Sequence, residues 1–128
     1  MDADQESFAE LRTDFSEDRT VLANERTFAS WMRTGLACIG IGLGFHALFN
    51  RLEPPWVPKG IATAFLLIAI FIFIAAERRS CDVLRRLHQH RVKSLGRSRM
   101  QAIAVVSVIA ALALVAAIWL LPLAPPQR

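Results

Sequence analysis

The sequence predicts an all-α protein with three transmembrane spans, and three observations support this: its composition, the grouping of its apolar residues and the distribution of its basic ones. Of the 128 residues, 54% are hydrophobic and 20% are charged. The apolar residues form three segments without Asp, Glu, Lys or Arg, from which we predict spans at about 34–50, 60–76 and 102–121. About 20 helical residues cross a bilayer core of roughly 30 Å, and flanking residues extend the shorter segments. This pattern excludes a soluble enzyme, a disulfide-stapled secreted domain and a disordered chain.

Residues 1–13 are expected to form an acidic tail, and residues 14–128 a single three-span membrane domain. Asp14 and Glu17 have the spacing of a capping box, so a helix is expected to begin there. No glycine or proline interrupts the stretch 15–34, so this helix should continue into the first span.

The dipeptide Arg-Thr recurs every seven residues before and at the start of the first span, at positions 12, 19, 26 and 33. Seven residues leave a drift of only ~20° around a helix, so Arg19, Arg26 and Arg33 should form one stripe. An apolar stripe lies about 40° away and consists of Phe8, Phe15, Leu22 and Ala29. We therefore expect an amphipathic cytoplasmic helix that continues into span 1.

The two connections between the spans differ in character. The first, at 51–58, contains three prolines and predicts a tight hairpin. The second lacks glycine and proline over 77–93, so span 2 is expected to continue as a helix and to stop at Gly96. Span 3 is expected to end near Pro122.

The basic residues predict an orientation. Twelve of the fifteen Lys and Arg residues precede span 1 or lie between spans 2 and 3, and three lie in the first connection or after span 3. The positive-inside rule then places the N-terminus in the cytoplasm and the C-terminus outside. The net charge of +4 reflects this topology and suits an anionic inner leaflet, so we expect no nucleic-acid partner.

A few residues are candidates for packing or chemistry. Gly40 and Gly44 have the G-x-x-x-G spacing that allows close helix packing, and we expect oligomerisation to depend on them. His46 is ionisable and lies inside a span, where we favour a neutral histidine bonded to a neighbouring helix over a proton relay. His88 and His90, at i and i+2, do not share a helix face, so no metal or cofactor is predicted. No nucleophile, base and orienting group occur together, and we do not expect an enzyme.

Two interpretations of the arginine stripe are equally compatible with its period. In the first, the arginines extend to lipid phosphates. In the second, the chain is an oligomer around a central axis, each position becomes a ring of guanidinium groups, and the rings bind phosphate and reject cations.

The block from Asn24-Glu-Arg-Thr27 to Thr34 resembles the signature of the YidH family, the small three-span proteins of domain of unknown function 202. The resemblance extends roughly over 19–121. The same motif opens the membrane domain of the vacuolar transporter chaperone complex, which makes polyphosphate and passes it through a pore lined by basic side chains.

The resemblance implies an anion site at Arg19, Arg26 and Arg33, and Arg78 and Arg79 at the start of the second connection look similar to its basic residues. We therefore expect a homo-oligomer of the bacterial inner membrane with an arginine-lined pore or binding site for phosphate or polyphosphate. The alternative is a non-conducting scaffold or regulatory subunit that binds a partner or anionic lipid. Flux through purified protein in liposomes would distinguish the two. We expect no counterpart of the polymerising and phosphate-sensing domains of the chaperone complex, and therefore no polymerase activity.

Overall fold

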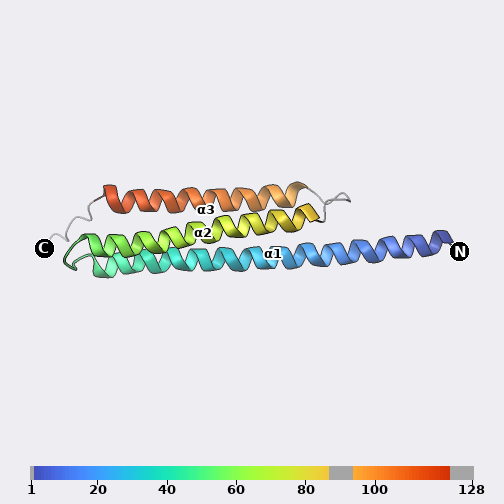
Figure 1. The fold of residues 1–128 in the computed structure, drawn as a ribbon, viewed down its shortest axis with the longest axis horizontal. Coiled ribbons are helices and arrows are strands. Elements are labelled where there is room, and N and C mark those ends of the chain that lie inside the picture. Colours follow the sequence, from blue (N-terminus) through green and yellow to red (C-terminus); the bar gives the residue numbers. More distant parts are fainter. Residues whose placement is uncertain (1, 87–93, 122–128) are drawn as a thin grey trace.

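Three long helices lie side by side in the structure, a computed structural model that describes residues 2–86 and 94–121 and the side chains of 2–82 and 98–121. They are α1 (Asp2–Phe49), α2 (Trp56–Arg86) and α3 (Ser94–Leu120). α2 lies between α1 and α3 and packs against both (Figure 1). Each helix is long and apolar enough to cross a membrane, so the prediction of an all-α chain with three candidate spans is confirmed for the described residues.

Helix α1 is longer than predicted. It begins at Asp2, so the predicted start at Asp14 is wrong. Residues 2–13 contain no glycine or proline, and Asp2 and Asp4 lie in the first turn, where acidic side chains favour the helix dipole. The helix therefore needs no cap at Asp14. Its 48 residues give a length of about 72 Å, and its N-terminal part projects beyond the other two helices (Figure 1).

The first connection is the tight hairpin that its prolines predict. α1 ends at Phe49 and α2 begins at Trp56, and between them the amide of Leu52 donates to the carbonyl of Phe49 at 3.0 Å. Pro58 lies in the first turn of α2, where the missing amide proton costs no helical hydrogen bond.

The second connection differs from the prediction at Gly96. α2 extends ten residues beyond the apolar segment, as expected, and ends at Arg86. α3 begins at Ser94, so Gly96 lies in the first turn of the next helix and does not stop α2. A glycine with ordinary helical geometry is tolerated near a helix start, where few hydrogen bonds depend on it. The predicted end of span 3 near Pro122 lies outside the described residues, and α3 ends at Leu120.

The core is a narrow line of contacts with α2 at its centre. Phe73, Ala69 and Ala76 of α2 pack against Phe28 and Met32 of α1, and Ala104 of α3 completes the cluster. Nearer the hairpin, Leu66 and Ala62 pack against Ile118. Large apolar side chains such as those of Leu48 and Phe71 are exposed along the spans, which suits a protein whose solvent there is lipid.

Candidate functional site

The three arginines of the repeat lie on the side of α1 that faces away from α2. The buried side of α1 contains Asn24 and Gly35, among other residues, whereas Arg19, Arg26 and Arg33 are all exposed. Arg26 is two residues from Asn24, and Arg33 is two residues from Gly35, which places each arginine about 200° around the helix from a buried neighbour. We call this exposed side, defined by Arg19, Arg26 and Arg33, the arginine face.

The arginine face also carries exposed apolar and small residues. Phe8 and Phe15 are 65% and 66% exposed. Farther along α1, a Cβ atom added to Gly40 or Gly44 would meet nothing within 4 Å. The arginine face therefore has no packing partner in the described part of the chain.

Each Arg-Thr repeat directs its two side chains to different partners. The hydroxyls of Thr13, Thr20, Thr27 and Thr34 each donate to the carbonyl four residues earlier, at 3.0 to 3.1 Å. The acceptors are the carbonyls of Ala9, Ser16, Ala23 and Ser30, which form a heptad series of small residues. Each threonine hydroxyl proton is used in a hydrogen bond within α1. In every repeat, the arginine is therefore the side chain that is available to bind an external group. The predictions from sequence did not include this threonine pattern, although the Arg-Thr repeat signals it.

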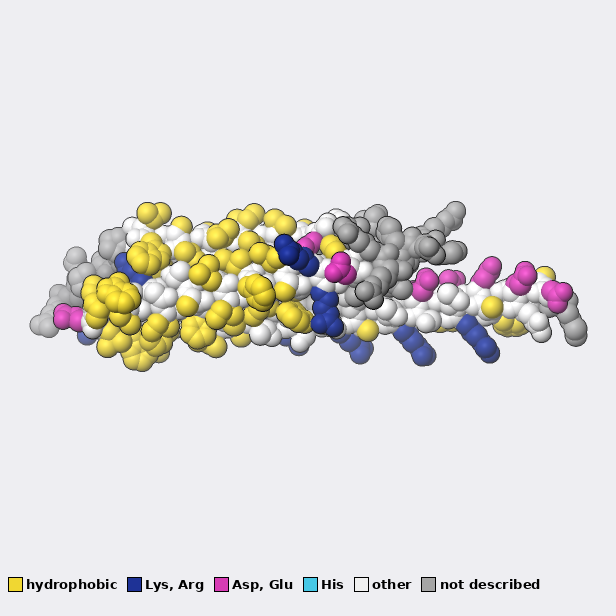
Figure 2. Space-filling view, viewed as in Figure 1, with side chains coloured by type: hydrophobic (Ala, Val, Ile, Leu, Met, Phe, Trp, Pro, Cys, Tyr) yellow, Lys and Arg dark blue, Asp and Glu magenta, His cyan; other side chains and the backbone are white. Residues whose placement is uncertain are grey.

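Charges of opposite sign lie on opposite sides of the N-terminal part of α1. Figure 2 shows basic side chains along one edge and acidic ones along the other. The acidic residues Glu10 and Glu17 precede Asn24 by fourteen and seven residues, so they continue the side of α1 that packs on α2. The arginine face is thus separated from the carboxylates of Glu10 and Glu17.

Arg78 and Arg79 lie on α2, and both are exposed. The Nδ2 of Asn24 donates to Ser80 Oγ at 3.2 Å, so these two arginines lie at about the same height as Arg26 along the helix pair. Adjacent residues point about 100° apart on a helix, so they do not form one stripe. The structure brings the five predicted arginines to one end of the bundle but distributes them over separate helix faces.

Two hydrogen bonds connect the three helices at the level of Asn24, and they were not predicted from the sequence. Asn24 and Ser80 are both buried, and the hydroxyl of Ser80 donates onward to Met100 Sδ at 3.0 Å. Asn24 belongs to the signature block, so one residue of that block serves to position α2 and α3. The spacing in the sequence signals that Asn24 is buried. Trp31 follows it by seven residues and Gly35 by eleven, and both lie on the side of α1 that faces α2.

The glycines that pack within the chain are not the pair with the G-x-x-x-G spacing. Gly35 lies under the ring of Phe73, and a Cβ at Gly42 would lie 3.0 Å from Phe65 Cβ and 3.2 Å from the carbonyl oxygen of Ala62. The role predicted for Gly40 and Gly44 concerns contacts between chains and stays a prediction.

His46 is buried, and the described residues do not form the hydrogen bond expected between it and a neighbouring helix. The side chain is 8% exposed, and its Nδ1 has no partner in the described part of the chain. Among the described residues, no group of three His, Cys, Asp or Glu side chains is placed to hold a metal ion.

The chain matches the model of a known protein family. A family model described as "Domain of unknown function (DUF202)" matches residues 19–86, which begin at the first arginine of the face and end with the last residue of α2. Comparisons with curated proteins and with solved structures found no match to the chain. The matched region covers more than half of the chain and contains all five arginines, and the protein therefore belongs to the DUF202 family.

Proposed function

We propose that the chain is a subunit of a homo-oligomer in the bacterial inner membrane, in which the arginine faces surround a site or path for phosphate-like anions. The observation that carries this proposal is the exposure of Arg19, Arg26 and Arg33 on one side of a continuous helix that enters the membrane. No ion pair within the described part of the chain neutralises them. The proposal contains no catalytic step.

Assembly through the arginine face would cover apolar side chains whose exposure to water costs free energy. Phe8 and Phe15 lie beyond the apolar segment of α1, where water would contact them. Gly40 and Gly44 on the same face would allow the backbones of neighbouring copies to approach closely within the membrane. Along α1, this one face therefore has exposed aromatic rings first, then the arginines, and then the two glycines within the apolar segment.

The chemistry of the arginine side chain favours an oxyanion as the bound species. A guanidinium group offers five donors in a planar fork, which matches phosphate in a bidentate fashion. A ring with one arginine from each copy also repels cations. Phosphate and polyphosphate are therefore the anions to test first.

The test is anion flux from liposomes that contain the purified protein. We expect wild type to release phosphate or short-chain polyphosphate, and Arg26→Ala combined with Arg33→Ala to lower the rate by about tenfold or more, since each lost charge contributes about 1 kcal/mol. Lysine at both positions should retain part of the rate, because it keeps the charge and loses the fork.

The control is Arg51→Ala, which removes an exposed arginine at the opposite end of the spans. It should leave the flux unchanged. Flux is compared only between variants whose oligomer mass equals that of wild type, because Glu25 lies beside Arg26 and a change at Arg26 could disturb assembly. Equal phosphate and polyphosphate release by wild type and by the assembled double alanine variant would eliminate the pore.

A second candidate function is a non-conducting scaffold, and the exposed rings of Phe8 and Phe15 on the projecting part of α1 favour it. A partner protein could cover these rings as well as another copy could. In this case Phe15→Ser would release the partner, the arginine variants would weaken binding to the partner or to anionic lipid, and liposomes would show no flux.

A further inference from the structure

We propose that the groove between α2 and α3 binds a phospholipid with a primary ammonium headgroup, with an acyl chain along the groove and the ammonium at Glu77. This site lies on other helices than the arginine face, and the inference does not depend on the function proposed above.

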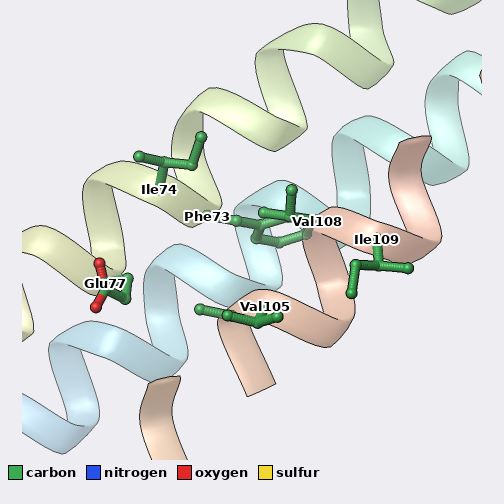
Figure 3. A pocket seen from close by; sticks show the side chains of 7 residues that line it. Phe73, Ile74, Glu77, Val105, Val108 and Ile109 are labelled. Carbon is green, nitrogen blue, oxygen red and sulfur yellow. The ribbon is translucent and has the colours of Figure 1, made fainter. Parts of the chain in front are cut away.

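The groove is apolar along most of its length. It has a volume of about 310 Å³, which is at the lower limit for small-molecule sites. Phe73 and Ala104 are buried beneath it, and Val105 and Ile109 of α3 are 55% and 59% exposed along one side. Figure 3 shows Glu77 at one end, with the remaining side chains extending away from it along α2 and α3. Within the bilayer such a groove is filled by hydrocarbon.

Among the residues whose side chains the structure describes, no cation balances the carboxylate at the end of this groove. Glu77 Oε1 accepts from Cys81 Sγ at 3.2 Å and from Gln101 Nε2 at 3.4 Å, and both donors are neutral. No Lys or Arg among the described residues forms an ion pair with it. A partly buried carboxylate in an apolar setting is costly unless a cation accompanies it, so the groove favours a ligand with a positive group at one end.

The position of Glu77 matches the level of lipid headgroups. It is the first charged residue after the apolar segment 60–76. Arg78 follows it, is exposed, and lies four residues after Ile74, a residue that lines the groove. Four residues turn a helix through about 400°, so Arg78 lies beside the groove on its α2 side.

Glu77 and Arg78 together present opposite charges to one headgroup. A phospholipid with a primary ammonium group can place this group at Glu77 and its phosphate at Arg78, while the acyl chain contacts Phe73, Val105 and Ile109. An anionic lipid without the ammonium would satisfy Arg78 and leave Glu77 unpaired, so the pair of side chains discriminates between the two lipids.

Native mass spectrometry of the purified protein in detergent tests this proposal. The probes are phosphatidylethanolamine and phosphatidylglycerol with identical acyl chains, titrated separately. We expect Glu77→Gln to weaken phosphatidylethanolamine binding by about tenfold, because a hydrogen bond to a charged group is lost, and to leave phosphatidylglycerol binding unchanged. Glutamine retains an acceptor for Cys81 and Gln101, so the contact between α2 and α3 is preserved.

Two matched pairs make the result specific. Asp82→Asn removes an exposed acid from the same helix outside the groove and should have no effect. Val105→Trp should fill the groove and prevent binding of phosphatidylethanolamine, whereas Val106→Trp, at the next residue and outside the groove, should not.

Three results would overturn the proposal. The first is equal phosphatidylethanolamine binding by wild type and Glu77→Gln. The second is equal binding by the Val105→Trp and Val106→Trp variants. The third is a loss of oligomer mass in Glu77→Gln with no lipid released, because a cation of a second copy, and not a lipid, would then occupy the groove.

Discussion

At the scale of single residues, the space around each glycine decides its role. Gly35 lies under Phe73, whose ring is fully buried and cannot move aside without displacing its neighbours in the core. Gly40 has open space on the opposite side of the same helix. The sequence predicts that glycines in span 1 allow close packing of helices. Their spacing does not show which of them face α2, because the pattern of one helix carries no information about where its neighbours lie.

We therefore predict opposite outcomes for two glycine substitutions. Gly35→Leu should destabilise the folded chain by about 1–3 kcal/mol or more, since it overfills the contact between α1 and α2. Gly40→Leu should leave the stability of the chain unchanged and alter the mass of the oligomer. Unfolding in detergent and mass measurement separate the two effects, and a Gly40→Leu variant with the wild-type mass would reject the proposed contact between copies.

At the scale of elements, each helix was recognisable from its sequence, but two predicted ends were wrong. The spacing of Asp14 and Glu17 is a local signal for a helix start. Because the residues from Asp2 onward are all compatible with a helix, α1 begins at Asp2 and continues through Asp14. The charge-free segments and the proline-rich hairpin were strong signals and are confirmed. The contact between Asn24 and Ser80 joins residues that are 56 positions apart, and no periodicity in either helix encodes such a pair.

The Asn24 contact predicts how the helices are held together. Asn24→Ala should lower the free energy of unfolding by about 0.6 kcal/mol, the average for hydrogen bonds between membrane helices, and by no more than about 1.7 kcal/mol, the largest value for such bonds. Thr27→Ala is the control, because its hydroxyl bonds only to the carbonyl of Ala23 in its own helix. A double-mutant cycle with Ser80→Ala checks the pairing: a coupling energy near zero between positions 24 and 80 would show that the contact does not stabilise the bundle.

At the scale of the whole molecule, the charge distribution and the hydropathy both indicate three spans with most of the basic residues at one end of the bundle. The projecting part of α1, the charged end of α2 and the start of α3 all lie at one end of the bundle (Figure 1). Twelve of the fifteen basic residues belong to the segments at or beyond this end, as the sequence predicts for three spans. The groove with Glu77 was not predictable, because it arises from the separation of α3 from α2, and no local pattern describes the space between two helices.

The charge asymmetry predicts that the N-terminus is cytoplasmic and the C-terminus is outside. In a chain with Cys38→Ala and Cys81→Ser, single cysteines at Asp14 and Glu53 report the two sides, because the first lies on the projecting part of α1 and the second in the hairpin, and both positions are exposed. A membrane-impermeant maleimide added to intact cells should label position 53 and not position 14, and permeabilised cells should show both. The rule acts through short, strongly basic segments near the spans, so reversal would require the twelve basic residues to cross the membrane while only three remained inside. Labelling of position 14 from outside intact cells would invert the topology and place the arginine face on the external side, where an anion path would need a different source of substrate.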